Sequence, residues 1–416
     1  MISRNEYLQK LIVRMNNGMI KVVTGIKGCG KSYLLFEIFY NYLIENGIDE
    51  NHIITLQLDD RTNIKYRDPD NLCEYIHSKI VDDKNYYILL DEVQYVKEFE
   101  DVLNSFLHIK NADVYVTGSN AKFLSSDIIT EFRGRGDQIH LSPLSFKEYF
   151  DYCEQNFEDA WNEYSMYGGM PYLLMCKTDE QKIHYLDNLF KETYIKDIVN
   201  RNNIRNTEIL EDILNIVSSS VGSLINPNKL SNSFKSIKNL KVAPNTIKQY
   251  LDYCVDSFLI EKSYRYDVKG RKYLDTPLKY YFTDIGLRNV RLGFRQQEEN
   301  HIMENIIFNE LINRGYQVDV GAVTISEKNK NNNYVRKQTE VDFVCNLGYE
   351  RYYIQSALNI DDIAKKEQEE KSLLKIDDNF KKIIIVKGSF KKWKDEKGIL
   401  VLGLKEFLLD PDSMKS

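Results

Sequence analysis

The chain has 416 residues, of which 43% are hydrophobic and 28% charged, and its formal net charge is -6 at pH 7. These values are normal for globular proteins and exclude an intrinsically disordered chain. The negative charge excludes a protein coated in basic residues for indiscriminate nucleic-acid binding. The length predicts two to four domains of about 100–200 residues each.

Hydropathy and cysteine usage exclude several further classes. No apolar run approaches the roughly 20 residues of a membrane span, and the N-terminus MISRNEYLQK lacks the apolar segment of a signal peptide. We therefore expect a cytoplasmic protein that does not contact the membrane. The six cysteines include no C-x-x-C pair and have no histidine at zinc-site spacing, so neither a disulfide framework nor a zinc site is predicted.

The first region of the chain alternates strands and helices. A predicted strand over 19–24 leads into a Gly-rich turn and then into a helix with apolar spacing. Further β-rich runs follow at 53–58, 86–90, 114–118 and 137–141. Strands that alternate with helices form parallel βαβ crossovers. The pattern predicts a three-layer α/β domain with a parallel sheet over residues 1–150.

Two further regions follow. Residues 151–290 are predicted to hold a helical linker and then a winged helix-turn-helix, in which Pro227 and Pro244 open helices and DVKGRKY forms a hairpin tip. Residues 291–416 begin with a helix that ends at Gly315. Three strands, a charged helix and a further strand come after it, which predicts a separate α/β domain.

Residues 25–32, GIKGCGKS, match the pattern G-x-x-x-x-G-K-[ST] between a predicted strand and a predicted helix. This is the context of a P-loop, in which backbone N–H groups and a helix N-terminus surround phosphates. Lys31 would reach the β- and γ-phosphates, and the Ser32 hydroxyl would bind Mg²⁺. We therefore expect ATP and Mg²⁺ to be held by Gly25, Gly28, Cys29, Gly30, Lys31, Ser32 and Tyr33.

A second motif complements the first. The apolar strand in YYILLDEVQ ends in Asp91 and Glu92, at the edge of the sheet where the P-loop is expected. Asp91 would hold Mg²⁺ through water. Glu92 would polarise the attacking water, because hydrolysis needs a base in line with the γ-phosphate. The pair predicts ATP hydrolysis rather than nucleotide binding alone.

Two other polar positions are candidates for the same reaction. Asn120 follows the strand VYVTG and could orient the water, although an ordinary turn or helix cap explains it equally well. Arg135, in EFRGRGDQIHL, could reach the γ-phosphate bound to a neighbouring subunit, which would imply a homo-oligomer. The alternative for Arg135 is a surface arginine or an internal ion pair.

The segments GIKGCGKS, LLDEVQ, TGSN, FRGRG and PLSFKEY, in this order, resemble the prokaryotic AAA-type ATPases that carry a C-terminal PD-(D/E)xK-like domain. The resemblance extends over nearly the whole chain. It implies an ATPase domain of the additional-strand type, a winged helix and a restriction-endonuclease-like α/β domain. It also implies that Arg135 is the residue in the position of the family's candidate arginine finger.

The resemblance bears on the chemistry of the last domain. Glu304 and Asp342 match the family's acidic positions, whereas the strand that ends in E-x-K in active members ends here in Gln355-Ser356-Ala357. Glutamine is a weak ligand for a hard cation, and alanine cannot activate water. We therefore expect a decayed metal site without nuclease activity. Lys365 or Lys366 on the following helix could replace the missing lysine, unless they belong to a solvated helix face.

Positive charge is concentrated in one segment. Residues 229–272 contain 10 Lys and Arg against 4 Asp and Glu. Lysines on the two helices and basic residues near the hairpin tip are suited to phosphate contacts. We expect DNA or another nucleic acid to bind at Lys229, Lys248, Arg271 and Lys272, with Lys235, Lys238 and Lys269 nearby. The alternative is that the module packs against its neighbours or a protein partner.

Three functions are consistent with these features. The first is an ATP-driven conformational switch that acts on nucleic acid, and the second is an ATP-dependent nuclease, against which Gln355 and Ala357 argue. The third is a nucleotide-gated interaction protein, for example in stress or phage response, without nucleic-acid contact. Of these the first has the most support in the sequence.

Overall fold

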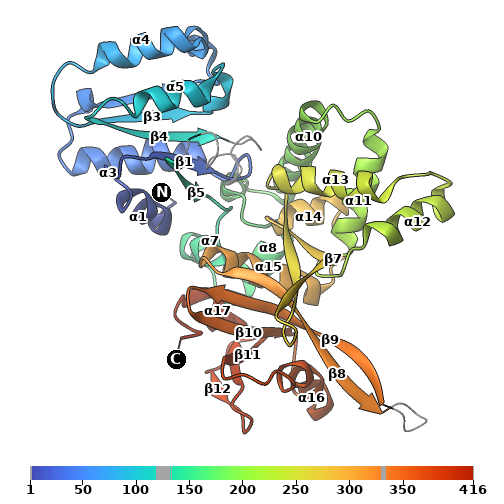
Figure 1. The fold of residues 1–416 in the computed structure, drawn as a ribbon. Helices are drawn as coiled ribbons and strands as arrows, with labels where there is room; N and C mark the ends of the chain where they lie inside the picture. Colours follow the sequence, from blue (N-terminus) through green and yellow to red (C-terminus); the bar gives the residue numbers. More distant parts are fainter. Residues whose placement is uncertain (1, 119–131, 133, 329–333, 416) are drawn as a thin grey trace. The chain divides into compact units, whose positions relative to one another are not determined.

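The structure, a computed structural model, describes residues 2–118, 132, 134–328 and 334–415. The chain forms two compact units (Figure 1). Unit 1 is Met1–Pro143 with the short segment Asp256–Phe258, and unit 2 is Leu144–Val255 with Leu259–Ser416. The boundary expected near residue 290 lies inside unit 2, whose elements are joined by a single sheet.

Unit 1 is built on a parallel sheet of five strands in the order β2-β3-β4-β1-β5. The strands are β1 (Ile20–Thr24), β2 (Ile53–Gln57), β3 (Tyr86–Asp91), β4 (Ala112–Gly118) and β5 (Gly136–His140). Each lies within two residues of a strand expected from the sequence. Strand β4 lies between β1 and β3, so an additional strand separates the P-loop strand from the strand that carries Asp91.

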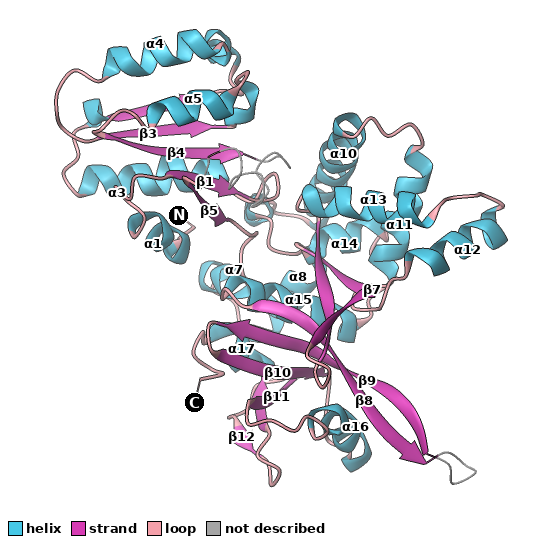
Figure 2. Cartoon of the chain, in the orientation of Figure 1, coloured by secondary structure: helices cyan, strands magenta, loops and turns pink. Residues whose placement is uncertain are grey.

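Helices cover both faces of this sheet, as Figures 1 and 2 show. They are α1 (Asn5–Ile12), α2 (Lys31–Tyr33), a π-helical segment (Leu34–Phe39), α3 (Tyr40–Glu45), α4 (Pro69–Lys79) and α5 (Phe99–Phe106). Because side chains alternate along a strand, Ile88 and Leu90 of β3 join one apolar cluster with Phe106 of α5. On the opposite face the rings of Phe39 and Tyr115 lie 4.6 Å apart.

Unit 2 begins with helices. Residues 145–222, all of which the structure describes, form helices and turns and no strand, as the sequence predicted. The α-helices of unit 2 that precede β8 (Gln317–Lys328) are α7 (Phe146–Cys153), α8 (Phe157–Tyr167), α9 (Asp179–Asn188), α10 (Lys196–Arg201), α11 (Thr207–Ser219), α12 (Pro227–Lys238), α13 (Pro244–Asp256), α14 (Ile285–Arg291) and α15 (Glu299–Asn313). Helices α12 and α13 begin at the two prolines that were expected to open them.

The second sheet has eight strands in the order β12-β13-β11-β10-β9-β8-β6-β7. The strands are β6 (Ile260–Asp267), β7 (Lys272–Phe282), β8 (Gln317–Lys328), β9 (Tyr334–Leu347), β10 (Glu350–Ala357), β11 (Lys381–Val386), β12 (Trp393–Lys394) and β13 (Leu400–Gly403). Helices α16 (Ile363–Leu373) and α17 (Leu404–Leu409) complete the unit. From α15 to β11 the elements follow the order that the sequence predicted.

One pairing in this sheet was not expected. Strands β6 and β7 form an antiparallel hairpin, and β6 also pairs in parallel with β8, from Arg265 opposite Val320 to Asp267 opposite Ala322. The hairpin and the C-terminal strands therefore share one sheet. This pairing joins segments that are more than fifty residues apart, so no local pattern could predict it.

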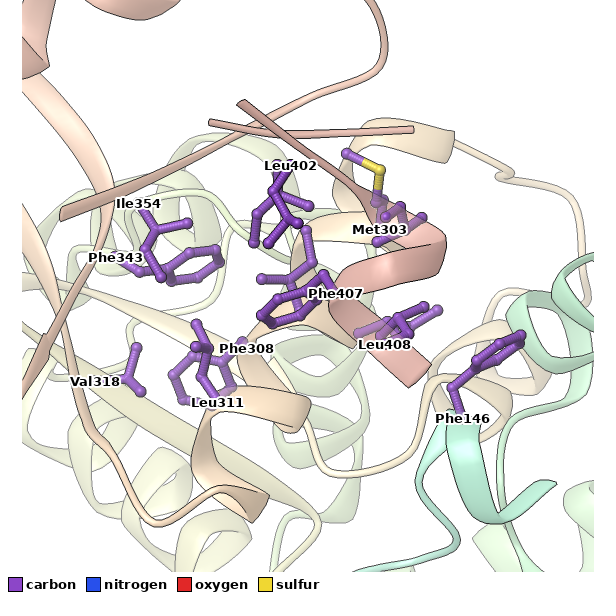
Figure 3. Packing of buried hydrophobic residues seen from close by; sticks show 14 of the residues in the cluster. Phe146, Met303, Phe308, Leu311, Val318, Phe343, Ile354, Leu402, Phe407 and Leu408 are labelled. Atoms are coloured by element: carbon purple, nitrogen blue, oxygen red, sulfur yellow. The ribbon is translucent and has the colours of Figure 1, made fainter. Parts of the chain in front are cut away.

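A large apolar cluster lies in unit 2 (Figure 3). Phe308 and Leu311 of α15 pack with Phe343 of β9 and Ile354 of β10. The cluster extends to Phe407 of α17 and to residues of α7 and α8. The core thus fixes α15 against strands β9 and β10, the three elements that carry Glu304, Asp342 and Gln355.

Candidate functional site

The P-loop follows β1 directly, at the carboxyl end of the sheet. Gly25 has φ 145°, and a Cβ atom there would lie 2.2 Å from the carbonyl oxygen of Leu141, so no larger residue fits. Gly30, with φ 99°, lies in the left-handed region just before α2 begins at Lys31. The loop therefore depends on glycine where the motif requires it.

Lys31 turns back over its own loop. Its side chain is buried, and Nζ donates to the carbonyl oxygens of Gly25 at 3.1 Å and Ile26 at 3.4 Å. An ammonium group held over a loop of backbone N–H groups, at the first turn of a helix, makes a concave positive site. Its chemistry suits the phosphates of a nucleotide.

Asp91 and Ser32, both expected at the Mg²⁺ site, lie within hydrogen-bonding distance of each other. Asp91 is buried at the end of β3, and the Thr117 hydroxyl on neighbouring β4 donates to its carboxylate. Burial raises the pKa of Asp91 above its ordinary value, and hydrogen bonds from Thr117 and Ser32 oppose that rise. A hydroxyl and a carboxylate side by side are oxygen ligands of the kind that Mg²⁺ prefers, so these residues fit the expected cation.

Glu92 lies just beyond Asp91 in a constrained conformation. Its φ of 51° is in the left-handed region, which costs a residue other than glycine about 1–3 kcal/mol. Its backbone N–H donates to the Thr117 hydroxyl at 2.9 Å, and the Gln94 side-chain amide donates to its carboxylate. The Thr117 hydroxyl thus links the two acidic residues by contacting both.

The sequence did not reveal Thr117 or Gln94, because the polar side chain that orients water was expected at Asn120. The signal for Thr117 was its place in TGSN, one residue before the end of β4 and next to Asp91 across the sheet. Asn120, which was expected to orient water, lies outside the described residues.

Arg135 does not lie with the other candidates of its own chain. It is exposed and precedes β5, and its carbonyl oxygen accepts a hydrogen bond from the N–H of Ile20 at 2.8 Å. Ile20 begins β1, whereas the P-loop follows the other end of that strand. At a rise of about 3.3 Å per residue, roughly 13 Å of strand separates the two edges. Arg135 therefore cannot complete the site of its own chain in this geometry.

His140 is a neighbour of the P-loop that the sequence did not reveal. Its Nδ1 lies 3.4 Å from the Thr24 hydroxyl at the end of β1, and its ring centroid lies 5.0 Å from that of Phe258. Burial, together with the positive charges of Lys31 and Lys10, lowers the pKa of His140 to about 4. The imidazole is therefore neutral near pH 7 and adds no charge beside Lys31.

A second cluster of charged side chains lies in unit 2. Nζ of Lys279, on β7, lies 2.9 Å from Oε1 of Glu304 and 2.6 Å from Oε1 of Glu340. The Tyr281 hydroxyl donates to the same Glu304 oxygen at 2.7 Å. Asp342, two residues after Glu340 on β9, belongs to the same electrostatic group as Lys279. We call Glu304, Glu340, Asp342 and Lys279 the acidic centre.

The remaining positions of the expected nuclease motif have other partners. Asp342 accepts hydrogen bonds from the Ser356 N–H at 2.9 Å and hydroxyl at 3.0 Å, and Ala357 is buried in an apolar cluster. Lys365 donates to Asn359, while Lys366 pairs with Glu370 at 3.4 Å. Neither helix lysine contacts Asp342 in the described part of the chain. Within that part, no group of three acidic, histidine or cysteine residues is arranged to bind a metal ion.

The basic segment is exposed on unit 2. Lys238 pairs with Asp212 at 2.6 Å and is therefore not a free cation. The other candidates are exposed and form no ion pair in the parts of the chain that the structure describes: Lys229, Lys235, Lys248, Lys269, Arg271 and Lys272. They lie on α12, on α13 and at the turn of the β6–β7 hairpin. Among the described residues, no helix is long and apolar enough to span a membrane.

Comparisons with known proteins agree with this geometry for the first part of the chain. Residues 17–150 match the family model of an AAA domain, and residues 158–298 match a domain of unknown function, DUF8612. The AAA match covers the P-loop, Asp91, Glu92 and Arg135. Unit 1 is therefore a P-loop ATPase domain of the AAA class, as the resemblance implied.

Solved structures with related folds are similar at a low level. The ORC1 protein of Aeropyrum pernix, in complex with DNA, aligns over 70% of this chain and 93% of its own, with 11% identity and a TM-score of 0.27. The Hsp104–ADP complex of S. cerevisiae aligns over 76% of this chain and 43% of its own, with 9% identity and a TM-score of 0.32. Scores this low support no inference, so the assignment rests on the family comparison and the motifs.

Sequence relatives extend over the whole chain. An "Uncharacterized protein" of Methanocaldococcus jannaschii is 28% identical over 86% of this chain and 78% of its own length. An "Uncharacterized protein" of Haemophilus influenzae is 33% identical over 98% of this chain and 99% of its own length. The chain therefore belongs to the same family as the Haemophilus influenzae protein.

Proposed function

We propose that the protein binds ATP with Mg²⁺, hydrolyses it, and uses the cycle as a conformational switch on nucleic acid. The observation that carries the first part is the grouping of Lys31, Ser32, Asp91 and Glu92 at one edge of the sheet. The Thr117 hydroxyl ties the last two of these together. The AAA domain match supports the same reading.

In this proposal each residue has one role. Backbone N–H groups of residues 28–33 and the Lys31 ammonium bind the phosphates, and the Ser32 hydroxyl and Asp91 carboxylate hold the cation. The cation would neutralise charge on the transferred phosphoryl group. Glu92 accepts a proton from the attacking water, and Gln94 and Thr117 orient Glu92 from its carboxylate and its backbone.

Arg135 is proposed to act in a neighbouring subunit. Arg135 lies next to Ile20, at the end of β1 that is remote from the P-loop. This distance from its own nucleotide site supports action in trans. A second copy of the chain would then have to present Arg135 to the γ-phosphate. Hydrolysis would depend on assembly of a homo-oligomer.

The nucleic-acid part of the proposal rests on unit 2. Helices α11 to α13 are followed by the β6–β7 hairpin, and Ile225 bridges Leu278 of β7 in antiparallel fashion. This arrangement supports a winged helix, with α13 as the helix that would enter a groove. Lys248 on α13, Lys229 on α12, and Arg271 and Lys272 at the hairpin turn are exposed and free of ion pairs within the described residues.

The C-terminal elements α15, β8, β9, β10, α16 and β11 support a PD-(D/E)xK-like fold without its chemistry. An ATP-dependent nuclease is the second candidate function, and the presence of Glu304 and Asp342 favours it. The engagement of both acids by protein donors counts against it. A nucleotide-gated protein-interaction switch is the third.

Binding of DNA and RNA by Glu92→Gln protein tests the proposal. In the presence of ATP the variant should stay bound to nucleic acid. Its affinity should fall steeply from the lower to the higher of two salt concentrations, because phosphate contacts release counterions. Replacing Lys229, Lys248, Arg271 and Lys272 together by alanine should abolish that binding. The matched control replaces four exposed lysines of unit 1, Lys65, Lys79, Lys84 and Lys110.

Equal loss in both quadruple variants, or binding that does not change with salt, would contradict contact through the winged helix. Binding that is absent in every nucleotide state would favour the protein-interaction switch. In that case, proteins that co-purify with Glu92→Gln protein in ATP would identify the partner.

A further inference from the structure

The acidic centre of unit 2 contains a buried cation that belongs to the protein. Lys279 is one of the few buried lysines of the described chain, and only 2% of its surface is exposed. Its ammonium group lies between carboxylates of two different elements, Glu304 of α15 and Glu340 of β9. A buried charge is tolerated only when it is paired. The two carboxylates therefore hold the ammonium group of Lys279 in its buried place.

We infer that Lys279 is the resident cation of the acidic centre, and that it occupies the place of a divalent metal ion and closes the centre to metal. The lysine comes from β7, not from the β10 position where Ala357 stands or from α16. Lys279 is therefore neither of the two lysines that the sequence suggested, Lys365 and Lys366. The inference concerns unit 2 alone and does not depend on ATP hydrolysis in unit 1.

The hydrogen bonds of the acids support this assignment. Oε1 of Glu304 accepts from both Lys279 and the Tyr281 hydroxyl. Oδ2 of Asp342 accepts from the N–H and the hydroxyl of Ser356. Protein donors therefore already engage one carboxylate oxygen of each acid, and a metal ion bound to that oxygen would have to compete with them. A Cβ atom added at Gly222 would lie 2.8 Å from the other Glu304 oxygen, which leaves little room on that side.

The charge balance points the same way. Burial lowers the pKa of Lys279, but the carboxylates of Glu304, Asp342 and Glu340 outweigh burial and raise that pKa above its ordinary value. The lysine therefore stays protonated. Burial raises the pKa of Glu304 to about 7, against the opposing effect of Lys279.

The consequence is that removing the charge of Lys279 should open the centre to a divalent ion. Lys279→Met keeps most of the side-chain length and removes the charge, while Lys279→Arg keeps the charge. Lys262→Met is the matched control, because Lys262 lies on the partner strand of the same hairpin and pairs with Asp252 outside the centre.

The experiment measures Mn²⁺ binding to full-length, nucleotide-free, EDTA-treated protein at pH 8, from the electron paramagnetic resonance signal of free Mn²⁺. Wild type, Lys279→Arg and Lys262→Met should bind equal amounts. Lys279→Met should bind one more ion per chain, and Asp342→Asn in the same chain should abolish this gain. The Mn²⁺ should also raise the Tm of Lys279→Met protein and leave that of Lys262→Met unchanged.

Two results would overturn the inference. One is folded Lys279→Met protein that binds no more Mn²⁺ than wild type. The other is wild-type protein that loses a bound ion on Asp342→Asn, because the centre would then accept metal with Lys279 in place. If Lys279→Met does not fold, the charge-balanced double variant Lys279→Met with Glu304→Gln should fold. Failure of that rescue would show that Lys279 acts through packing and not as a counter-ion.

Discussion

At the scale of single residues, the proposed ATPase centre depends on a threonine as much as on the motif residues. The Thr117 hydroxyl donates to Asp91 and accepts from the N–H of Glu92, so one side chain sets the distance between the cation ligand and the base. Lys31 is held by two carbonyl oxygens of its own loop. These contacts determine what each substitution should remove.

Lys31→Ala should abolish ATP hydrolysis and weaken nucleotide binding. The ammonium group is the only side-chain cation of the loop that is buried at its centre, since Lys27 is exposed. Loss of one buried electrostatic donor typically lowers a rate by about 10²–10³. Steady-state hydrolysis and fluorescent-nucleotide titration measure the two effects. Lys27→Ala is the control in the same loop and should change neither, and equal effects of the two variants would contradict the role of Lys31.

Thr117→Val should lower the rate of hydrolysis by about 10–100-fold, because groups that orient ligands contribute effects of this size. It should also cost about 1–3 kcal/mol of unfolding free energy by leaving buried polar groups unpaired. Turnover at saturating ATP and urea denaturation measure these changes. Thr117→Ser, which keeps the hydroxyl, should recover most of the rate. A loss of stability without a loss of rate would mean that Thr117 is structural only.

At the scale of elements, the two sheets were not equally predictable. The five strands of unit 1 follow from apolar runs, and Ser32 and Asp91, which come from two separate motifs, lie within hydrogen-bonding distance of each other. The role of Thr117 depends on β4 lying beside β3, which is a matter of strand order and not of any local pattern. Lys279 was missed for the same reason, because it reaches the acidic centre through pairing of β6 with β8.

The order of β5 and β1 leads to a prediction for Arg135. Because Arg135 lies at the edge opposite the P-loop, its contribution requires a second chain. Hydrolysis per chain should therefore rise with protein concentration, and Arg135→Ala should lower the rate by as much as ~10³–10⁵ without loss of ATP binding. Turnover measured across a concentration series tests both points. Arg61→Ala, an exposed arginine of unit 1, is the control.

Mixing provides a sharper version of this test. Arg135→Ala protein has an intact P-loop, and Lys31→Ala protein has an intact Arg135. If the arginine acts in trans, a mixture of the two inactive variants should recover part of the activity. A mixture that stays inactive while the two proteins assemble, or turnover that is independent of concentration, would contradict action in trans.

At the scale of the whole molecule, the chain combines a P-loop unit with a second unit in which the β6–β7 hairpin and the C-terminal strands share one sheet. The acidic centre has carboxylates but holds Lys279 among them, and Gln355 and Ala357 stand where active members carry an acid and a lysine.

We therefore predict no metal-dependent nuclease activity. Two acids without the third ligand and the lysine of the motif should leave a metal-bound water poorly activated. Cleavage assays with Mg²⁺ and Mn²⁺ on single- and double-stranded DNA and RNA, with and without ATP, measure this directly. Cutting that is lost in Asp342→Ala but retained in Lys31→Ala would contradict the prediction and favour the ATP-dependent nuclease.

The central claim is that unit 1 hydrolyses ATP with Glu92 as the base, and Glu92→Gln tests it most directly. Binding of radiolabelled ATP and single-turnover hydrolysis are measured on the same preparation of wild type and variant. We expect the variant to bind ATP as wild type does, while its rate of hydrolysis falls by about 10²–10⁴, the usual contribution of a general base. Hydrolysis by Glu92→Gln protein at the wild-type rate would contradict it, because the base would then be another residue.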